Sequence, residues 1–359
     1  MGPMVGAEDL TLRGNPLLEA IVGSPTRDMT VTYSFELAGA EVDKSGYLGG
    51  SDLTRAWSDA EKANFRAVMD VYMAVSGLTL TEISSAASAD VRLQMVDSVP
   101  GGWAGYAGTG TTFVVGSSGE SLLTHEFGHS MGLGHPFDDS LSTQVLPGIN
   151  VEDDVTDQNE PGDFGFNANY YTVMAYETGS YYGYPDMDTA ESNSLGVLDI
   201  AALQVMYGTN DSTRLGNDTY GVSSSAQTIW DAGGVDTIDY SSLSSDAVVD
   251  LRAATLQLEE GGLGRPSLTD VSTGATDVGS HVIAYGVTIE NGFSGSGNDL
   301  LTGGAGADRF EVDTNWGNDT VSDFEDGVDL IDIRPAGLSF EDLVITQDGP
   351  DALVSDTDG

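Results

Sequence analysis

Two histidines and a glutamate stand at a spacing that suits a metal ion with a general base beside it. On a helix, His125 and His129 are four residues apart, so both imidazoles project from the same face. Gly132 lets the helix stop and turn, because glycine accepts a positive φ, and the turn can bring His135 round as a third nitrogen ligand. Three protein ligands that leave a fourth position open are typical of a catalytic zinc ion. Glu126 would stand beside that ion as the base that activates water.

The remaining residues distinguish a catalytic zinc site from a structural one. The pattern uses three of the four histidines in the chain, and the fourth is His281. The chain contains no cysteine, so nothing supplies the closed fourth ligand of the usual structural zinc site. The lack of cysteine also excludes disulfides and thiolate chemistry. The sequence therefore favours one catalytic zinc ion.

A second pattern is a repeat of nine residues in the C-terminal part of the chain. Residues 294–302 read SGSGNDLLT, and residues 303–311 read GGAGADRFE. This period and composition match the calcium-binding parallel β-helix repeat, whose glycines permit tight turns with inward carbonyls and whose aspartates supply carboxylates. Glu290 is in register with the repeat, whereas the unit that contains Asp319 is out of register by two residues. The alternative is a pair of solvated loops. The expected calcium ligands are Gly295, Gly297, Asp299, Gly304, Gly306 and Asp308.

The first half of the chain contains the helices and strands that must position the histidines. Ser58 and Glu61 form a capping box, which predicts a helix that runs to Gly77. This mixture predicts an α+β domain in which helices cover a small twisted sheet. Strands are expected at residues 30–35, 78–83, 91–95 and 112–115, and further helices after residue 119 and at residues 197–206.

The helical periodicity disappears after Gly208. From there the chain reads as short strands separated by Gly, Asp, Asn and Ser, for example at residues 228–230, 237–240 and 282–284. We therefore expect a domain at residues 1–208, followed at residues 209–359 by an all-β calcium-binding domain with the architecture of a parallel β-roll or sandwich.

The composition limits the classes of partner. The 359 residues suit two domains, and 57 acidic residues against 12 basic ones give a net charge of −45. Such a surface repels phosphate backbones and anionic lipids, which argues against nucleic acid and membrane partners, and no apolar run is long enough to insert into a bilayer. Disorder, salt adaptation or sites for hard cations could explain the acidic surplus. The 14 Tyr, 11 Phe and 4 Trp residues argue against disorder.

Residues downstream of the histidines point to a family. Residues 171–176 read YTVMAY, and a turn with Met174 after the long histidine pattern is the signature of the metzincins. Pro136 follows the third histidine, and Tyr176 stands two places after the methionine. The chain thus resembles the serralysins, secreted bacterial metzincin proteases with a calcium-binding C-terminal domain. The resemblance extends through residues 15–18, 32–35, 199–204, 228–234 and 286–291.

The resemblance implies roles for further residues. Met174 would form an apolar floor beneath the metal, and Tyr176 would be a zinc ligand in the resting enzyme that swings away to stabilise the oxyanion of the reaction. The family also implies secretion in one step without a cleaved N-terminal signal peptide, and a monomer. A second calcium site is implied at Arg214, Gly216, Asp218, Asp231, Gly233 and Asp236.

The termini and one acidic loop carry weaker expectations. Residues 8–27 are either the remnant of a propeptide or the N-terminal helix. The chain ends short of the usual C-terminal strands of the family, so we expect a trimmed or processed protein. The acidic stretch at residues 152–157 is expected to be a solvated loop beside the cleft.

These patterns predict a zinc endopeptidase that is stabilised by several calcium ions and acts on proteins or peptides. Glu126 would be the general base, and the segment at residues 102–107 the edge strand along which a substrate lies extended. The alternative is a calcium-dependent binding or adhesion protein with a vestigial protease domain.

Overall fold

The computed structural model describes most of the chain and contains four α-helices within the described residues. These helices are α1 (Pro16–Glu19), α2 (Asp59–Val75), α3 (Glu120–Ser130) and α4 (Val197–Tyr207). The described residues are 12–23, 28–44, 49–102, 104–107, 112–139, 143–152, 155–156, 158–176, 180–181, 184–188, 194–269 and 280–356.

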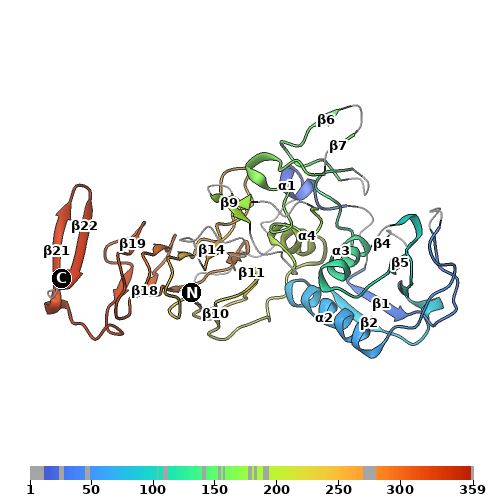
Figure 1. Cartoon of the computed structure of the whole chain (residues 1–359), viewed down its shortest axis with the longest axis horizontal. Helices are drawn as coiled ribbons and strands as arrows, with labels where there is room; N and C mark the ends of the chain where they lie inside the picture. Colours follow the sequence, from blue (N-terminus) through green and yellow to red (C-terminus); the bar gives the residue numbers. More distant parts are fainter. Residues whose placement is uncertain are drawn as a thin grey trace.

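The N-terminal half is built around a five-stranded mixed sheet with the order β2-β1-β3-β5-β4. The first four strands in this order are parallel to one another, and β4 is antiparallel to β5. Helices α2 and α3 contact each other, and α3 also contacts β4 and β5 (Figure 1). The strands are β1 (Thr30–Phe35), β2 (Thr79–Glu82), β3 (Val91–Met95), β4 (Gly105–Ala107) and β5 (Thr112–Val115).

Helix α2 follows the sequence prediction because both its start and its buried face are encoded locally. Ser58 accepts from the backbone of Glu61, and the Glu61 carboxylate accepts from the backbone of Ser58, so the capping box is formed. The fully buried Phe65 lies edge-on to the rings of Phe113 and Phe127. Edge-to-face ring pairs contribute roughly 1 kcal/mol each beyond the area that they bury, so this cluster holds α2 and α3 on the sheet.

The C-terminal region winds between two sheets. One sheet has the order β10-β12-β16-β18-β20 and contains only parallel pairs, while the other has the order β11-β15-β14-β13-β17-β19 and includes antiparallel β14. From β16 to β20, consecutive strands alternate between the two sheets. The strands are β10 (Thr219–Gly221), β11 (Ala226–Ile229), β12 (Thr237–Asp239), β13 (Val248–Asp250), β14 (Ser267–Leu268), β15 (Ser280–Ile283), β16 (Asn291–Phe293), β17 (Leu300–Thr302), β18 (Arg309–Glu311), β19 (Thr320–Val321) and β20 (Leu330–Asp332).

The expected C-terminal strands fall within a few residues of the observed ones. Trp230 was expected inside a strand, but β11 ends one residue earlier. Trp230 instead begins the turn after β11, and its indole N–H donates to the carbonyl oxygen of Asn210 at 3.3 Å. His281 is a buried structural residue, and its Nδ1 lies 2.7 Å from the hydroxyl of Tyr240.

The two halves are joined by a continuous apolar core and by side chains that cap α2. The last carbonyls of a helix have no intrahelical partner. In α2, the carbonyls of residues 73–75 instead accept hydrogen bonds from three residues around Gly208. The donors are Asn210 Nδ2 at 2.8 Å, Thr213 Oγ1 at 2.6 Å and Gln204 Nε2 at 3.1 Å. The main cluster of buried apolar residues likewise includes members on both sides of Gly208.

The described residues also form three small hairpins. They are β6 (Val151–Glu152) with β7 (Val155–Thr156), β8 (Ser180–Tyr181) with β9 (Tyr184–Asp188), and β21 (Leu343–Asp348) with β22 (Asp351–Asp356). The β21–β22 hairpin lies at the opposite end of the molecule from the mixed sheet (Figure 1). Short 3₁₀ turns lie at Ala86–Ser88, Pro100–Gly102, Asp163–Gly165 and Phe340–Asp342. Within the described part of the chain, no helix has the length and hydrophobicity needed to cross a bilayer.

Candidate metal centres

Helix α3 and the turn after it bring three imidazoles together. His125 and His129 share a face of α3, and Gly132, with φ of 95°, lets the chain turn so that His135 returns to them. The Nε2 atom of His135 lies 3.1 Å from that of His129 and 3.3 Å from that of His125. Around a tetrahedral zinc ion with Zn–N distances of about 2.0–2.1 Å, neighbouring nitrogens lie about 3.3 Å apart.

Hydrogen bonds to the other ring nitrogens fix which nitrogen is free to bind a metal. His125 Nδ1 lies 2.6 Å from the carbonyl oxygen of Val173, and His129 Nδ1 lies 2.9 Å from that of Leu133. A carbonyl can only accept, so each Nδ1 carries the proton and each Nε2 presents a lone pair. The Asp138 carboxylate lies 2.9 Å from His135 Nδ1 in the same role.

Burial keeps two of the imidazoles neutral. It lowers the pKa of His125 to about 4 and the pKa of His129 well below its usual range. Three converging lone pairs repel one another unless a cation lies between them. The donor set therefore fits a zinc ion.

Glu126 points into the same centre and is 6% exposed. Burial raises the pKa of its carboxyl group to about 8, although the backbone N–H of Ala107 donates to it. Its Oε2 atom has no hydrogen-bond partner among the described residues. A Cβ atom at Gly105 would lie 2.9 Å from Oε1, so the edge strand needs glycine there to admit the carboxylate. The arrangement leaves one carboxylate oxygen available for a proton.

The turn that contains Met174 is packed beneath the histidine helix. Met174 is fully buried, and a Cβ atom at Gly128 would lie 2.8 Å from its sulfur, so the glycine between the two histidines admits the methionine. Asp199 in α4 holds this turn from behind. Its buried carboxylate accepts from the hydroxyl of Thr172 at 2.6 Å and from the backbone N–H of Val173 at 2.8 Å. The carbonyl oxygen of Val173 is also the hydrogen-bond partner of His125 Nδ1, so Asp199 supports that histidine through the turn.

Tyr176 lies at the open side of the centre. Its hydroxyl is 3.1 Å from His135 Nε2, and the side chain is 44% exposed. Its ring also contacts His125 and Phe137. Burial and the nearby Glu126 raise the pKa of Tyr176 to about 12, so the hydroxyl keeps its proton at neutral pH. The structure thus places Tyr176 beside His125 and His135, and its role as a zinc ligand stays a prediction.

The calcium site that the resemblance implied between residues 214 and 236 gathers three carboxylates from two turns. Oxygen atoms of Asp218, Asp231 and Asp236 lie within 4.8 Å of one another. The carbonyl of Gly216 lies against Gly234, next to Asp236. Burial raises the pKa of Asp236 to about 6, and its Oδ2 atom has no hydrogen-bond partner in the described structure. Arg214 and Gly233 lie in the same two turns and both have positive φ angles, of 53° and 138°.

The two nine-residue repeats lie at opposite edges of the two-sheet region. Gly295, Gly297 and Asp299 lie in the turn from β16 to β17, and Gly304, Gly306 and Asp308 in the turn from β17 to β18, where the chain crosses back. Each aspartate therefore contacts the turn that precedes the next strand of its own sheet, which is two strands later along the chain, and not the turn of the neighbouring repeat. The backbone N–H of Asp299 donates to Asp319 at 3.0 Å, and that of Asp308 donates to Asp329 at 3.1 Å.

The two-residue offset of the Asp319 unit in the sequence does not displace Asp319 from Asp299 in the structure. Asp319 directly precedes β19, and Leu300 pairs with Thr320, so Asp299 and Asp319 are aligned. The longer connection between β18 and β19 absorbs the extra residues. Burial raises the pKa of Asp308 to about 6 and that of Asp319 to about 7. The Oδ2 atoms of Asp299, Asp308 and Asp319 are buried, with no hydrogen-bond partner among the residues that the structure describes.

The sequence interpretation missed Asp319 and Asp329 as partners of the predicted ligands Asp299 and Asp308. The acidic residues Asp236, Glu290, Asp299, Asp308, Asp319 and Asp329 each stand immediately before a strand. That position, rather than the nine-residue period, is the signal that could have found Asp319 and Asp329. No local pattern indicated the role of Asp199, because its carboxylate contacts Val173, which lies 26 residues earlier in the chain.

Two other expectations concern the cleft. Of the expected edge strand at residues 102–107, residues 105–107 form β4, one of the two edge strands of the mixed sheet; Gly102 lies in a 3₁₀ turn, and Trp103 lies outside the described residues. In the acidic loop, Asp153, Asp154 and Asp157 also lie outside the description, whereas residues 151–152 and 155–156 pair as a short hairpin.

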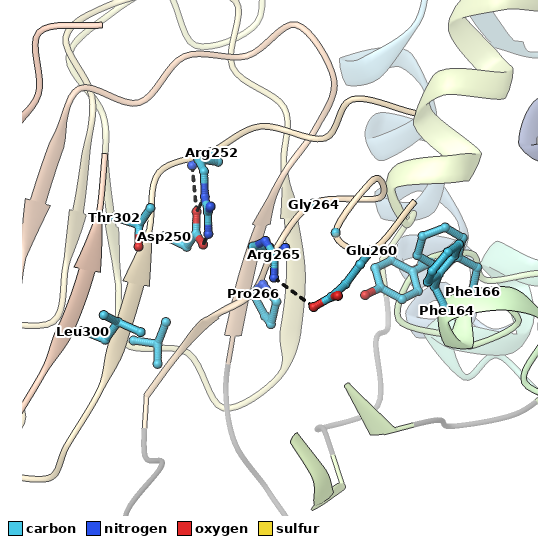
Figure 2. A pocket seen from close by; sticks show the side chains of 13 residues that line it. Phe164, Phe166, Asp250, Arg252, Glu260, Gly264, Arg265, Pro266, Leu300 and Thr302 are labelled. Atoms are coloured by element: carbon cyan, nitrogen blue, oxygen red, sulfur yellow. Dashed lines mark hydrogen bonds and ion pairs between the residues drawn. The ribbon is translucent and has the colours of Figure 1, made fainter. Parts of the chain in front are cut away.

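A cavity of about 110 Å³ lies away from the histidines, between the loop of Phe164 and the C-terminal sheets (Figure 2). Both arginines in its lining are paired with acidic neighbours. Arg252 Nε donates to Asp250 at 2.8 Å, and Arg265 lies 3.7 Å from Glu260. The cavity is thus part of the joint between the two halves.

Comparisons with known proteins find sequence similarity over much of the chain. Residues 198–348 match the family described as Peptidase M10 serralysin C terminal. Metallopeptidase AprA of Pseudomonas marginalis is 29% identical over 321 residues, which cover 78% of this chain and 61% of that protein. Serralysin of Proteus mirabilis is 27% identical over 358 residues, which cover 84% of this chain and 63% of that protein. The chain is thus similar in sequence to serralysins. It spans about three fifths of the length of these two serralysin-type relatives.

Among solved structures, myroilysin aligns with 53% of this chain and 97% of its own, at 14% sequence identity and a TM-score of 0.30.

Proposed function

We propose that the chain is a zinc-dependent endopeptidase that hydrolyses proteins or peptides. The observation that carries the proposal is the convergence of three Nε2 lone pairs beside a buried carboxylate that has one free oxygen. The names of the serralysin relatives support the same activity. His125, His129 and His135 would hold the ion.

The roles of the protein groups follow from their positions. A zinc ion held here supplies a Lewis acid that polarises the substrate carbonyl and lowers the pKa of water. Glu126 takes a proton from the attacking water and delivers it to the departing amine nitrogen. Tyr176 donates its hydroxyl proton in a hydrogen bond to the oxyanion that develops at the substrate carbonyl. A peptide lies extended along β4, the edge strand that contacts the histidine helix.

The proposal extends to the C-terminal region. We propose a first domain at residues 1–208 and a calcium-binding β-roll at residues 209–359. The support is the set of buried aspartate oxygens without hydrogen-bond partners and the raised pKa values of Asp236, Asp308 and Asp319. Carboxylates and backbone carbonyls are the ligands that Ca²⁺ prefers. Secretion and a monomeric state are proposed from the resemblance to the serralysins.

The alternative, a calcium-dependent adhesion protein with a vestigial protease domain, would not need a general base. A buried carboxylate is costly to keep without a function. The retained Glu126, with the glycine that makes room for it, favours the enzyme.

Casein digestion with and without zinc tests the proposed function. In excess calcium, the full chain should cleave casein, lose the activity when 1,10-phenanthroline removes zinc, and regain it when zinc is restored. Metal analysis should find about one zinc ion per chain, because the centre offers three imidazoles to one ion. Cleavage by zinc-free protein would contradict the proposal, and a serine-protease inhibitor serves as the control for a contaminating enzyme.

Replacing Tyr176 with Phe should lower kcat by roughly 100-fold with little change in KM, which is the usual effect of removing one oxyanion donor. The ring and its contacts with His125 and Phe137 stay, so the thermal unfolding temperature should not fall. Steady-state kinetics on a fluorogenic peptide measure both constants. A normal kcat would assign the tyrosine a packing role only.

A further inference from the structure

One side chain near the N-terminus connects the two halves of the protein. Asn15 caps α1, because its Oδ1 accepts from the backbone N–H groups of Leu17 at 3.0 Å and Leu18 at 3.2 Å. Its Nδ2 donates to the carbonyl oxygen of Leu256 at 3.1 Å, 241 residues away in the C-terminal region. The same residue therefore starts α1 and fixes it to the other half.

Helix α1 is short but firmly packed. The side chains of Leu17, Leu18, Ala20 and Ile21 are fully buried, and α1 contacts α4. A segment with this burial moves only with its surroundings. Its position depends on the core and on the hydrogen bond to Leu256.

The residues after α1 pair with the turn that joins the second and third histidines. Val22 forms an antiparallel bridge with Leu133. Two backbone hydrogen bonds of 2.8 Å flank the bridge, from the N–H of Gly23 to the carbonyl of Gly132 and from the N–H of Gly134 to the carbonyl of Ile21. The turn is thus held on both sides of Leu133.

This turn orients two of the three imidazoles. The carbonyl of Leu133 is the partner of His129 Nδ1, and His135 comes two residues later. A second connection leads to His135 through Gln144, whose backbone N–H donates to the carbonyl of Glu19 at 2.9 Å. The neighbouring Thr143 donates to the carbonyl of Asp138 at 2.9 Å, and the Asp138 carboxylate is the partner of His135.

We propose that Asn15 is a positioning residue for the zinc site. By fixing α1 to Leu256, it holds residues 21–23 against residues 132–134 and so keeps the imidazoles of His129 and His135 aimed at the ion. The inference rests on the proposed zinc site. Partners beyond the direct ligands typically alter metal affinity by 10–100-fold, so the C-terminal region contributes to zinc affinity without touching the ion.

The test uses the full chain with Asn15→Asp. The carboxylate still caps α1, but it cannot donate to Leu256. Its second oxygen would instead face the carbonyl oxygen of Leu256 and repel it. Zinc affinity is measured by competition with a chromogenic chelator at constant calcium. Asn15→Asp should weaken zinc binding about tenfold. It should also change the visible absorption spectrum of the cobalt-substituted protein, which reports ligand geometry.

Asn210→Asp is the matched control. Asn210 Nδ2 also donates to a distant carbonyl, that of Met73 at 2.8 Å, and its Oδ1 also accepts within its own turn, from Ser212 at 3.0 Å. The chemical change is the same, but this contact ends on α2 rather than on the segment that pairs with the turn at residues 132–134. Zinc affinity and the cobalt spectrum of Asn210→Asp should match the wild type, even where its thermal stability falls as far as that of Asn15→Asp.

The outcomes are distinct. Wild-type affinity in Asn15→Asp, or an equal loss in both variants, would overturn the positioning role. If Asn15→Asp does not fold, Asn15→Ser keeps a capping oxygen without the reach to Leu256, and the same loss of zinc affinity is expected. A wild-type protein that binds no zinc would contradict the proposed function itself.

Discussion

Replacing Glu126 with Gln should reduce casein cleavage by at least about 100-fold while the protein keeps its zinc ion. General bases contribute typically 10²–10⁴-fold, and an amide of the same shape cannot take a proton. The three histidines keep their partners, since Val173, Leu133 and Asp138 hold their Nδ1 atoms and Glu126 takes no part in these contacts. Activity and zinc content, measured on the same sample, check both parts of the expectation.

The structure also predicts that E126Q folds well. The amide oxygen of Gln can accept from Ala107 as the carboxylate does, and it needs no more room beside Gly105. An amide carries no charge at any pH, so its burial should cost no more than that of the carboxyl group, and the unfolding temperature should not fall. His129→Ala is the matched control, because it should lose the zinc ion. Turnover by E126Q above about one hundredth of the wild-type rate would exclude Glu126 as the base.

Removing calcium should unfold the C-terminal region, and calcium chloride should restore it where sodium chloride does not. Without an ion, the buried Oδ2 atoms of Asp236, Asp299, Asp308 and Asp319 have no hydrogen-bond partner among the described residues. Bound calcium would satisfy these oxygens and stabilise the folded state by mass action. Circular dichroism after calcium-selective chelation measures the loss of strand signal. Equal recovery in both salts at matched ionic strength would support general salt adaptation instead.

The pH dependence has a defined sign. Burial raises the pKa of Asp308 to about 6 and that of Asp319 to about 7, from an ordinary value of 3.8. The calcium-free folded state therefore binds protons more tightly than the unfolded chain. Its stability should fall as the pH rises from about 4 to about 7, because the folded state must then give up these protons. With calcium bound, acidification should destabilise the region, since protons compete with the ion.

A pair of variants separates the stacked carboxylates from surface charge. Asp319→Asn removes a buried oxygen charge and should raise the calcium concentration needed for half-maximal folding. Asp313→Asn, in the same connection but at an exposed residue, removes the same charge from the surface and should leave that concentration unchanged. Equal shifts in the two variants would mean that net charge, rather than dedicated sites, sets the calcium requirement.

Locally encoded features could be predicted well from the sequence. The capping box at Ser58 gave the start of α2, and the spacing of His125 and His129 gave a helix with both imidazoles on one face, because each depends on residues within one or two turns. Turn composition placed the C-terminal strands to within a few residues for the same reason.

Features that depend on distant partners could not be predicted. Asn15 was noticed only as part of a resemblance, and nothing nearby indicates that its amide meets Leu256. Asp199 looks like an ordinary helix N-terminal acid, yet it holds the turn beneath the histidines. The pairing of Asp299 with Asp319 depends on strands that return to the same sheet two crossings later. Sequence periodicity measures spacing along the chain, whereas these contacts depend on how the chain folds back.

The capping of α2 has a consequence for timing. A chain leaves the ribosome from its N-terminus, and α2 is complete long before its last carbonyls find their partners. Those partners, Gln204, Asn210 and Thr213, lie 129 to 139 residues later along the chain. During synthesis, the C-terminal turn of α2, which packs against the histidine helix, therefore stays frayed until these partners have been made. The proposed zinc site therefore reaches its final packing only after residues 204–213 have been synthesised, well after the histidines themselves.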